Sequence, residues 1–166
     1  GDSVLYDRNS GIGRVFGNVS IADSTNKIII SGDYGEHHEI TDSSWVTGHA
    51  LMSQIFTIDT LFLHGDNLLA VGEKIPVDTI QKKRNMFAFH HVKLVKPDCQ
   101  GSCDSLVYNY QDSTIRMFSN PILWSGLNQL TADSVTIQTA NSSISLIYLV
   151  NNAFITSEAD SNGIQI

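Results

Sequence analysis

Apolar and polar residues alternate along most of the chain with the period of two that is typical of half-buried β-strands. The alternation is clearest over residues 27–31, 60–63, 134–138 and 143–148. Clusters of Asp, Asn, Ser and Gly separate these runs at short intervals, whereas helical periodicity is almost absent. The pattern predicts an all-β domain of repeated short antiparallel strands that spans residues 1–166, either as a complete protein or as part of a longer polypeptide.

Two short signatures repeat in alternation along the chain. In the first, an Asp opens an alternating apolar run; it occurs at Asp2, Asp33, Asp66, Asp104 and Asp133. In the second, a strand crosses an Asn or a His, at Asn18, His49, His91, Asn120 and Asn152. Three of the Asp residues precede their Asn or His by 16 positions, and the longer copy at Asp66 predicts a loop insertion over 72–78. This recurrence indicates an internal structural repeat.

Fixed positions within the two signatures are apolar in every copy except at Gly35 and His37. Because strand side chains alternate between two faces, these positions share one apolar face. A folded-over sheet or jelly roll is the economical way to bury it. The interior is then either a trough for an apolar ligand or a core filled by its own side chains, and the sequence leaves both readings open. The candidate interior residues are Val15, Val19, Ile21, Val46, Ala50, Met52, Val92, Leu94, Leu106, Tyr108, Met117, Leu123, Val135, Ile137, Leu149 and Ile155.

The charge balance argues against a nucleic-acid partner. The chain has 10 Lys and Arg against 17 Asp and Glu, a formal net charge of −7, whereas nucleic-acid binding depends on clustered cations. The one basic run, residues 82–84, is interpreted as a solvated turn. No segment approaches the roughly 20 apolar residues that a membrane-spanning helix needs.

The two cysteines lie close together, at Cys99 and Cys103, in a segment that contains Pro97 and Gly101 and is typical of a turn. Such a pair predicts a small disulfide loop in an oxidising compartment, with free thiols as the second interpretation. A zinc site would need two more ligands at suitable spacing, so we expect neither a metal nor a cofactor.

Residues that resemble catalytic or metal-binding groups have structural explanations. His37–His38 and His90–His91 are neighbours in predicted strands, where adjacent side chains point to opposite faces, so neither pair can chelate one ion alone. The repeated Asp residues at strand entries favour backbone hydrogen bonding over catalysis. Neither a Gly-x-Ser-x-Gly elbow nor a phosphate-binding glycine loop occurs, and the sequence predicts a protein that is not an enzyme.

Residues 14–21, Arg-Val-Phe-Gly-Asn-Val-Ser-Ile, and the Gly-Asp strand entries at 32–33 and 65–66 carry a family resemblance. With their alternation across nearly the whole chain, they resemble the OstA-like (organic solvent tolerance) family of lipopolysaccharide-transport proteins of Gram-negative bacteria. Two copies depart from the family pattern, because Pro121 replaces the usual Val and residues 101–104 replace the Gly-Asp entry.

The resemblance implies a periplasmic β-taco or β-jellyroll whose apolar interior carries the acyl chains of lipopolysaccharide or its lipid A. It also implies partners: other lipopolysaccharide-transport proteins through strand-edge pairing, or further copies of the chain joined end to end. Such a protein bridges the inner and outer membranes or belongs to the outer-membrane assembly. The alternative is a structural or carbohydrate-binding β module with a closed core, which predicts exposed aromatic residues on an outer face.

Overall fold

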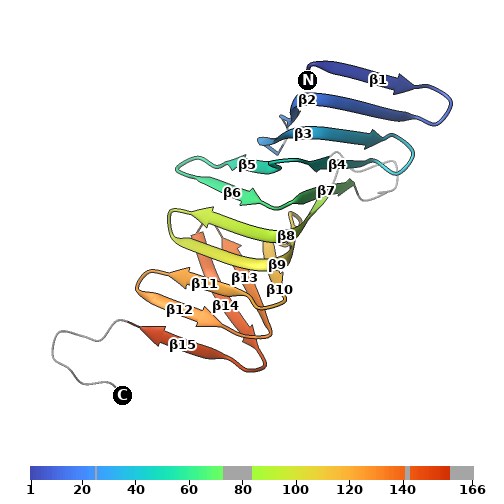
Figure 1. Ribbon diagram of the computed structural model, residues 1–166. Helices are drawn as coiled ribbons and strands as arrows, with labels where there is room; N and C mark the ends of the chain where they lie inside the picture. Colours follow the sequence, from blue (N-terminus) through green and yellow to red (C-terminus); the bar gives the residue numbers. More distant parts are fainter. Residues whose placement is uncertain (25, 73–83, 141–142, 158–166) are drawn as a thin grey trace.

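The computed structural model describes residues 1–24, 26–72, 84–140 and 143–157, and all regular structure within them is β-strand, as the alternation predicts (Figure 1). The strands are β1 (Ser3–Asp7), β2 (Ile12–Asp23), β3 (Ile28–His38), β4 (Ser43–Thr47), β5 (Leu51–Ile55), β6 (Thr60–His64), β7 (Asn67–Gly72), β8 (Arg84–Lys96), β9 (Cys99–Asn109), β10 (Thr114–Phe118), β11 (Ile122–Ser125), β12 (Asn128–Thr131), β13 (Ser134–Ala140), β14 (Ser143–Val150) and β15 (Phe154–Ser157). Apart from Gly72, the predicted loop insertion over 72–78 lies outside the described residues, and so do Lys82 and Lys83 of the basic run.

All fifteen strands join one antiparallel sheet that is folded over into two leaves. The four longest strands, β2, β3, β8 and β9, run through both leaves. The first leaf contains β1, residues 12–16 of β2, 34–38 of β3, β4, β7, 84–89 of β8, 105–109 of β9, β10, β13 and β14. The second leaf contains residues 19–23 of β2, 28–32 of β3, β5, β6, 92–96 of β8, 99–103 of β9, β11, β12 and β15. The predicted folded-over β architecture is therefore confirmed.

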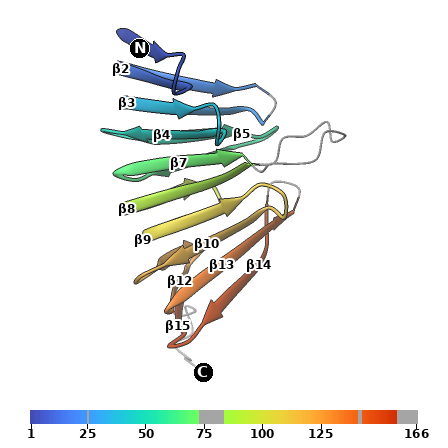
Figure 2. The same cartoon turned by 90° about the vertical axis from the view of Figure 1, so that its right-hand side faces the viewer.

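The strands are stacked from β1 at one end of the molecule to β15 at the other, and both views show this order (Figures 1 and 2). At the C-terminal end, β13 and β14 run steeply across the view of Figure 1, whereas β11, β12 and β15 lie closer to the horizontal. The two leaves therefore cross at a larger angle here than near β3 and β4, as the twist of a long sheet accumulates.

At about every second passage from one leaf to the other, two consecutive residues adopt a positive φ. The described residues contain five such pairs, and the second residue is always the Asn or His of the repeat: Gly17–Asn18, Gly48–His49, His90–His91, Ser119–Asn120 and Asn151–Asn152. In β2 and β8 the pair lies opposite one residue of the next strand, Asp33 or Asp104, and forms a β-bulge. Asn and His enter the left-handed region more readily than most residues, which explains why the repeat keeps these two types.

The repeated Asp residues hold this corner from the neighbouring strand. In every copy the Asp backbone N–H donates to the carbonyl of the residue before the Asn or His: Asp2 to Gly17, Asp33 to Gly48, Asp66 to His90, Asp104 to Ser119 and Asp133 to Asn151, at 2.8–3.2 Å. In four copies the carboxylate also contacts the Asn or His side chain. Asp104 differs, since its carboxylate lies 3.2 Å from Nδ1 of His90 instead. The number of residues between the Asp and the Asn or His of each copy is therefore the sequence distance between two hydrogen-bonded sides of one corner.

The apolar columns of the two signatures interleave into continuous rows on the inner face. One row crosses the whole first leaf, and its residues are Val4, Val15, Gly35, Val46, Leu68, Ala88, Leu106, Met117, Val135 and Leu149. A matching row in the second leaf contains Ile21, Ile30, Met52, Leu63, Leu94, Gly101, Leu123, Leu130 and Ile155. These rows face each other and form one hydrophobic core.

The predicted disulfide is wrong, because Cys99 and Cys103 are both free and buried. They lie four residues apart on the inner face of β9, and a strand rises by about 3.3 Å per residue, so their Cα atoms are about 13 Å apart. A disulfide needs roughly 4.4–6.8 Å. Gly101 belongs to this strand rather than to a turn. Its lack of a side chain leaves room for Met117, because a Cβ there would lie only 2.8 Å from Cε of Met117.

The described residues include no helix that is long and apolar enough to cross a membrane.

Candidate functional site

The structure brings the predicted interior residues together between the two leaves. Twelve of the sixteen are at most 4% exposed: Val19, Val46, Ala50, Met52, Val92, Leu94, Leu106, Tyr108, Met117, Leu123, Val135 and Ile137. Val15, Ile21 and Leu149 are half-buried. Ile155 occupies the inner row of the second leaf but is 57% exposed, because β15 lies at its edge.

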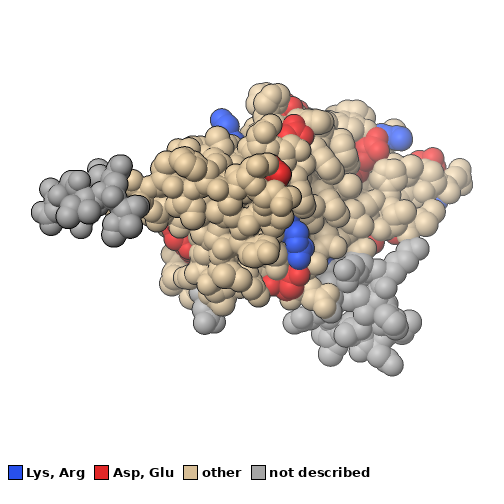
Figure 3. Space-filling view, turned by 90° about the horizontal axis from the view of Figure 1, so that it is seen from below, with Lys and Arg blue, Asp and Glu red and all other residues tan. Residues whose placement is uncertain are grey.

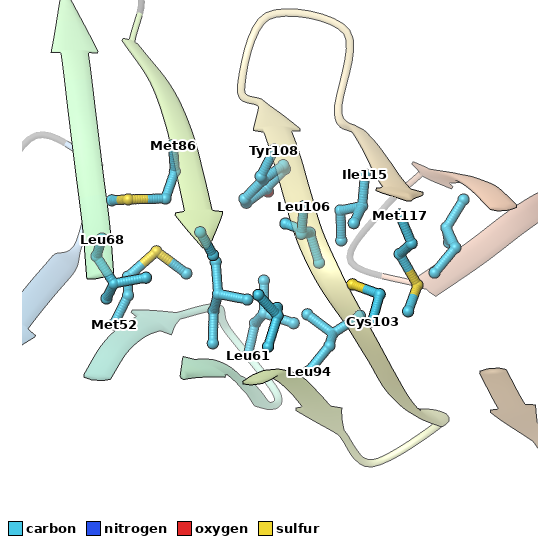
Figure 4. Close-up of a cluster of buried hydrophobic side chains, with 14 of the residues drawn as sticks. Met52, Leu61, Leu68, Met86, Leu94, Cys103, Leu106, Tyr108, Ile115 and Met117 are labelled. Atoms are coloured by element: carbon cyan, nitrogen blue, oxygen red, sulfur yellow. The ribbon is translucent and has the colours of Figure 1, made fainter. Parts of the chain in front are cut away.

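Side chains fill the middle of this interior. Met52 of the second leaf lies beside Leu68 of the first, with Met86 close by, and Tyr108 and Leu106 continue the packed layer (Figure 4). The hydroxyl of Tyr110, just beyond β9, contacts Sδ of Met52 at 3.1 Å and ties the two leaves together. Of the two readings that the sequence leaves open, the filled core is therefore the one found in the middle of the molecule.

The interior opens at the N-terminal end, where a cavity of about 650 Å³ lies between the leaves. Val15 of β2 lies beside Gly35 of β3 in the first leaf, where His37 also lines the cavity, and Ile21 of β2 lines it from the second leaf. Gly35 leaves this space because it has no side chain, and a Cβ there would lie 3.1 Å from Cγ1 of Val19. The two residues that interrupt the apolar columns of the sequence thus both line the cavity.

The rim of the cavity is polar and its groups are held by hydrogen bonds. His37 Nδ1 lies 3.0 Å from Oγ of Ser44, and Asp23 accepts a hydrogen bond of 2.8 Å from the Asn26 side chain. Arg84, the described residue of the basic run, is the first residue of β8 and pairs with Asp42 at 3.2 Å, so it is not a solvated turn residue. The cavity therefore joins an apolar wall to a rim that carries both signs of charge.

A smaller space of about 20 Å³ continues inward from this cavity, between Ile28, Ile30 and Met86. Tyr110 lines it, and burial raises the pKa of this phenol well above its usual range. The narrowing marks the point where the open mouth gives way to the filled core.

On the side away from the corner, a buried ion cluster links the leaves in the C-terminal half. Lys96 Nζ lies 2.9 Å from Asp59 and 2.8 Å from Asp98, and only 5% of the Lys96 side chain is exposed. Burial acts to lower the pKa of Lys96, but the hydrogen bonds that its ammonium donates to Asp98 and Asp59 outweigh burial, and the pKa is raised. Asp98 also accepts a bond of 3.2 Å from the backbone N–H of Ile144 at the start of β14, across the gap between the leaves. The two leaves are thus linked here by the ion cluster and the Asp98–Ile144 hydrogen bond, whereas a cavity separates them near β2 and β3.

Both ends of the sheet present apolar strands. Val4, Leu5 and Tyr6 of β1 are 47–69% exposed. At the other end, Leu146 and Tyr148 of β14 are 55% and 62% exposed. The strands β11 to β15 contain no Asp, Glu, Lys or Arg, and the surface seen from this end carries few charged side chains (Figure 3).

The side chains of both histidine pairs contact neighbouring strands or residues of the same strand through hydrogen bonds and ion pairs. His90 and His91 are not alternating strand neighbours as predicted, since both have a positive φ at the corner, and they contact Asp104 and Asp66 respectively. In the part of the chain that the structure describes, no group of three or more His, Cys, Asp or Glu side chains could hold a metal ion.

The position of the cavity and the Lys96 cluster are not predicted from the sequence. The break of the apolar columns at Gly35 and His37 is the signal that could have located the cavity. The Lys96 cluster gives no such signal, because Asp59 and Lys96 meet only when β6 pairs with β8.

No protein-family model matches this chain, and no curated protein is significantly similar to it in sequence.

Proposed function

We propose that this protein is a non-catalytic lipid carrier of the Gram-negative periplasm, which holds acyl chains of lipopolysaccharide between its two leaves. The observation that carries the proposal is the cavity of about 650 Å³ at the N-terminal mouth, which is continuous with the apolar inner rows through Val15 and Ile21. The resemblance to OstA-like proteins supports the choice of cargo and compartment.

The chemistry of the mouth suits an amphiphile. A volume of this size is within the range of small-molecule sites, roughly 300–1,000 Å³. Transfer of an acyl chain from water gains about 0.8 kcal/mol per CH₂, so affinity requires no catalytic group. The rim residues His37, Ser44 and Arg84 supply polar contacts for the part of the lipid that stays at the opening.

Deeper insertion requires the leaves to separate, and the composition of the core favours this. All three methionines of the chain, Met52, Met86 and Met117, are at most 1% exposed between the leaves. Methionine is unbranched and polarisable, so it repacks around a guest more readily than Leu or Ile. Ala50, Ala88 and other small residues of the core reduce the bulk that has to move.

Bridging to partners is supported by the strand edges. Natural proteins usually protect an edge strand with charges, prolines or bulges, and β14 and β15 have neither a charge nor a proline. An edge of this kind suits strand addition by another transport protein or by a second copy.

The test is site-specific photo-crosslinking to purified lipopolysaccharide. A photoreactive residue at Ile21, which lines the mouth, is compared with one at Ser20, the exposed neighbour on the other face of β2. Leu94 and Lys93 form the matching pair in the middle of β8. We expect crosslinks at Ile21 and not at Ser20 or Lys93; a crosslink at Leu94 adds that the leaves part. A folded protein without crosslinks at Ile21 would contradict lipid carriage.

The filled middle of the core favours one second candidate, a structural or carbohydrate-binding module that never opens. That candidate predicts no lipid crosslink at Ile21 or Leu94.

A further inference from the structure

The outer face of the first leaf has a groove of about 380 Å³, on the opposite side of the sheet from the lipid cavity. Its lining comes from three adjacent strands, β3, β4 and β7. The lining residues are Tyr34, Glu36, His38, Ser43, Trp45 and Leu69. These side chains alternate with inner-face residues such as Val46, so the groove lies on the outer face; Glu36 is the one residue that it shares with the lining of the cavity.

An aromatic and aliphatic strip forms the floor. Strand register places Glu36, Trp45 and Leu69 side by side in one row, and Phe87 of β8 follows Leu69. Phe87 stacks with Phe89, with ring centroids 6.4 Å apart and planes at 3°. Trp45 and Leu69 are half-buried, so part of the apolar surface beside Glu36 stays in contact with solvent.

A fixed polar network forms the wall beside Trp45. The Glu36 carboxylate accepts hydrogen bonds from the Tyr34 hydroxyl and from Nε of Arg14 at 3.0 Å, and it lies 3.1 Å from Nε2 of His38. The hydrogen bonds from Tyr34, Arg14 and His38 lower the pKa of Glu36 to about 2, so its carboxylate is charged at neutral pH. The network holds donors and an acceptor in place before any ligand arrives.

Several hydrogen-bonding sites of this groove are unused by the described residues. The indole N–H of Trp45 donates to none of their atoms, in contrast to Trp124, whose N–H donates to Gln129 at 3.1 Å. A carboxylate offers about four lone-pair sites, and three protein groups contact Glu36. Arg14, which pairs with Glu36 from β2 just outside the groove lining, carries about five N–H donors, of which Nε is the one bonded to Glu36.

A pyranose ring combines an apolar C–H face with a rim of hydroxyl groups that both donate and accept. We propose that the groove binds a pyranose unit of a glycan, with the ring face on Trp45 and Leu69 and its hydroxyl groups on Glu36, Arg14 and the Trp45 indole N–H. A lipid tail would leave the polar groups without partners, which is costly. A phosphate would meet the Glu36 carboxylate, and an added β-strand has no free edge here, because β3, β4 and β7 are internal strands.

The experiment is an NMR titration of the ¹⁵N-labelled full chain with methyl β-glucopyranoside, methyl β-galactopyranoside and methyl N-acetyl-β-glucosaminide. These probes carry no acyl chain, so any shift reports on the sugar ring and not on the lipid cavity. We expect the Trp45 indole signal to move and saturate with at least one probe, with a dissociation constant on the order of 1 mM. The Trp124 indole, which lies on an outer face at 40% exposure and whose N–H donates to Gln129, should stay in place.

Variants separate binding from folding. Trp45→Ala should abolish the backbone shifts around β3 and β4, and Trp124→Ala should leave them unchanged. Glu36→Gln keeps the shape of the groove and should weaken binding roughly tenfold or more, since its charge-assisted acceptor is lost. The proposal is overturned if no probe moves the Trp45 signal, or if Trp124→Ala and Trp45→Ala reduce the shifts equally while both spectra stay dispersed.

Discussion

Nδ1 of His49 lies 2.8 Å from Oδ2 of Asp33, across the corner at which the sheet folds over. His49 has a φ of 54° and follows Gly48 at 71°. Both side chains are well exposed, at 91% for His49 and 63% for Asp33, so the ion pair itself contributes little in water. The greater requirement at this position is a residue that tolerates the left-handed backbone.

We therefore expect His49→Val to lower the free energy of unfolding by about 1–2 kcal/mol, the cost of a left-handed conformation for a residue with a Cβ branch. His49→Asn should change it by less than about 0.5 kcal/mol, since Asn occupies the same position at Asn18, Asn120 and Asn152 and tolerates this conformation. Urea denaturation of the two variants measures both values. Equal losses would mean that the imidazole of His49 itself, rather than tolerance of the left-handed backbone, stabilises this position.

The corner also shows which parts of the fold can be predicted from sequence. Short strands and the apolar face follow from alternation, and the 16-residue spacing corresponds to real partners such as Asp2 and Asn18. The strand order does not follow, because the columns of the two signatures interleave only after pairing, as when Val46 meets Leu68. The turn predicted around Gly101 fails for a packing reason, since this glycine gives room to Met117 within a strand.

The reactivity of the two cysteine thiols tests whether Cys99 and Cys103 are free, as the structure shows. Burial raises the pKa of Cys99 and of Cys103 to about 11 in each case, so neither forms an appreciable thiolate at neutral pH. We expect both to resist Ellman's reagent in the native protein and to react at the rate of unfolding. After incubation of the native protein under oxidising conditions, its mass should be unchanged. Denaturation should then reveal two titratable thiols. A loss of two mass units and of both thiols would restore the disulfide.

The Lys96 cluster predicts a large effect of a single substitution. Lys96→Met leaves Asp59, only 10% exposed, as a buried carboxylate without its cation, and we expect a loss of about 3–5 kcal/mol in the free energy of unfolding at neutral pH. The double variant Lys96→Met with Asp59→Leu removes the cation and the more buried of its two carboxylates, leaves Asp98 at 36% exposure, and should recover much of this loss. Denaturation at several pH values adds a second readout: the deficit of the single variant should shrink on acidification, because the unpaired carboxylate takes up a proton. A deficit independent of pH would point to lost packing of the Lys96 stem.

The lowered pKa of Glu36 predicts how this residue changes the free energy of unfolding in acid. Its pKa lies at about 2 in the folded protein, mainly through hydrogen bonds from Tyr34, Arg14 and His38, against 4.5 for the ordinary group. A carboxylate whose pKa is lower in the folded than in the unfolded protein stabilises the fold at pH values above its unfolded pKa. This stabilisation is lost as the pH falls through the folded pKa. The Glu36→Gln variant should therefore lose less stability than the parent between about pH 4.5 and 2. Parallel pH profiles for the two proteins would show that the network leaves Glu36 unshifted.

Gly35 offers the most direct test of the mouth. Its φ is not in the left-handed region, so the backbone of β3 accepts Gly35→Ile; because a Cβ there lies 3.1 Å from Cγ1 of Val19, Val19 shifts by a few tenths of an ångström and the new side chain enters the cavity beside it. Exclusion of about two methylene groups of an acyl chain costs about 1.6 kcal/mol, which corresponds to roughly a tenfold loss of affinity. The crosslinking yield from Ile21 to lipopolysaccharide should fall accordingly over a lipid titration. Ser20→Ile adds a similar side chain to the exposed face of β2 and should leave the yield unchanged, whereas an equal fall in both variants would place the lipid elsewhere.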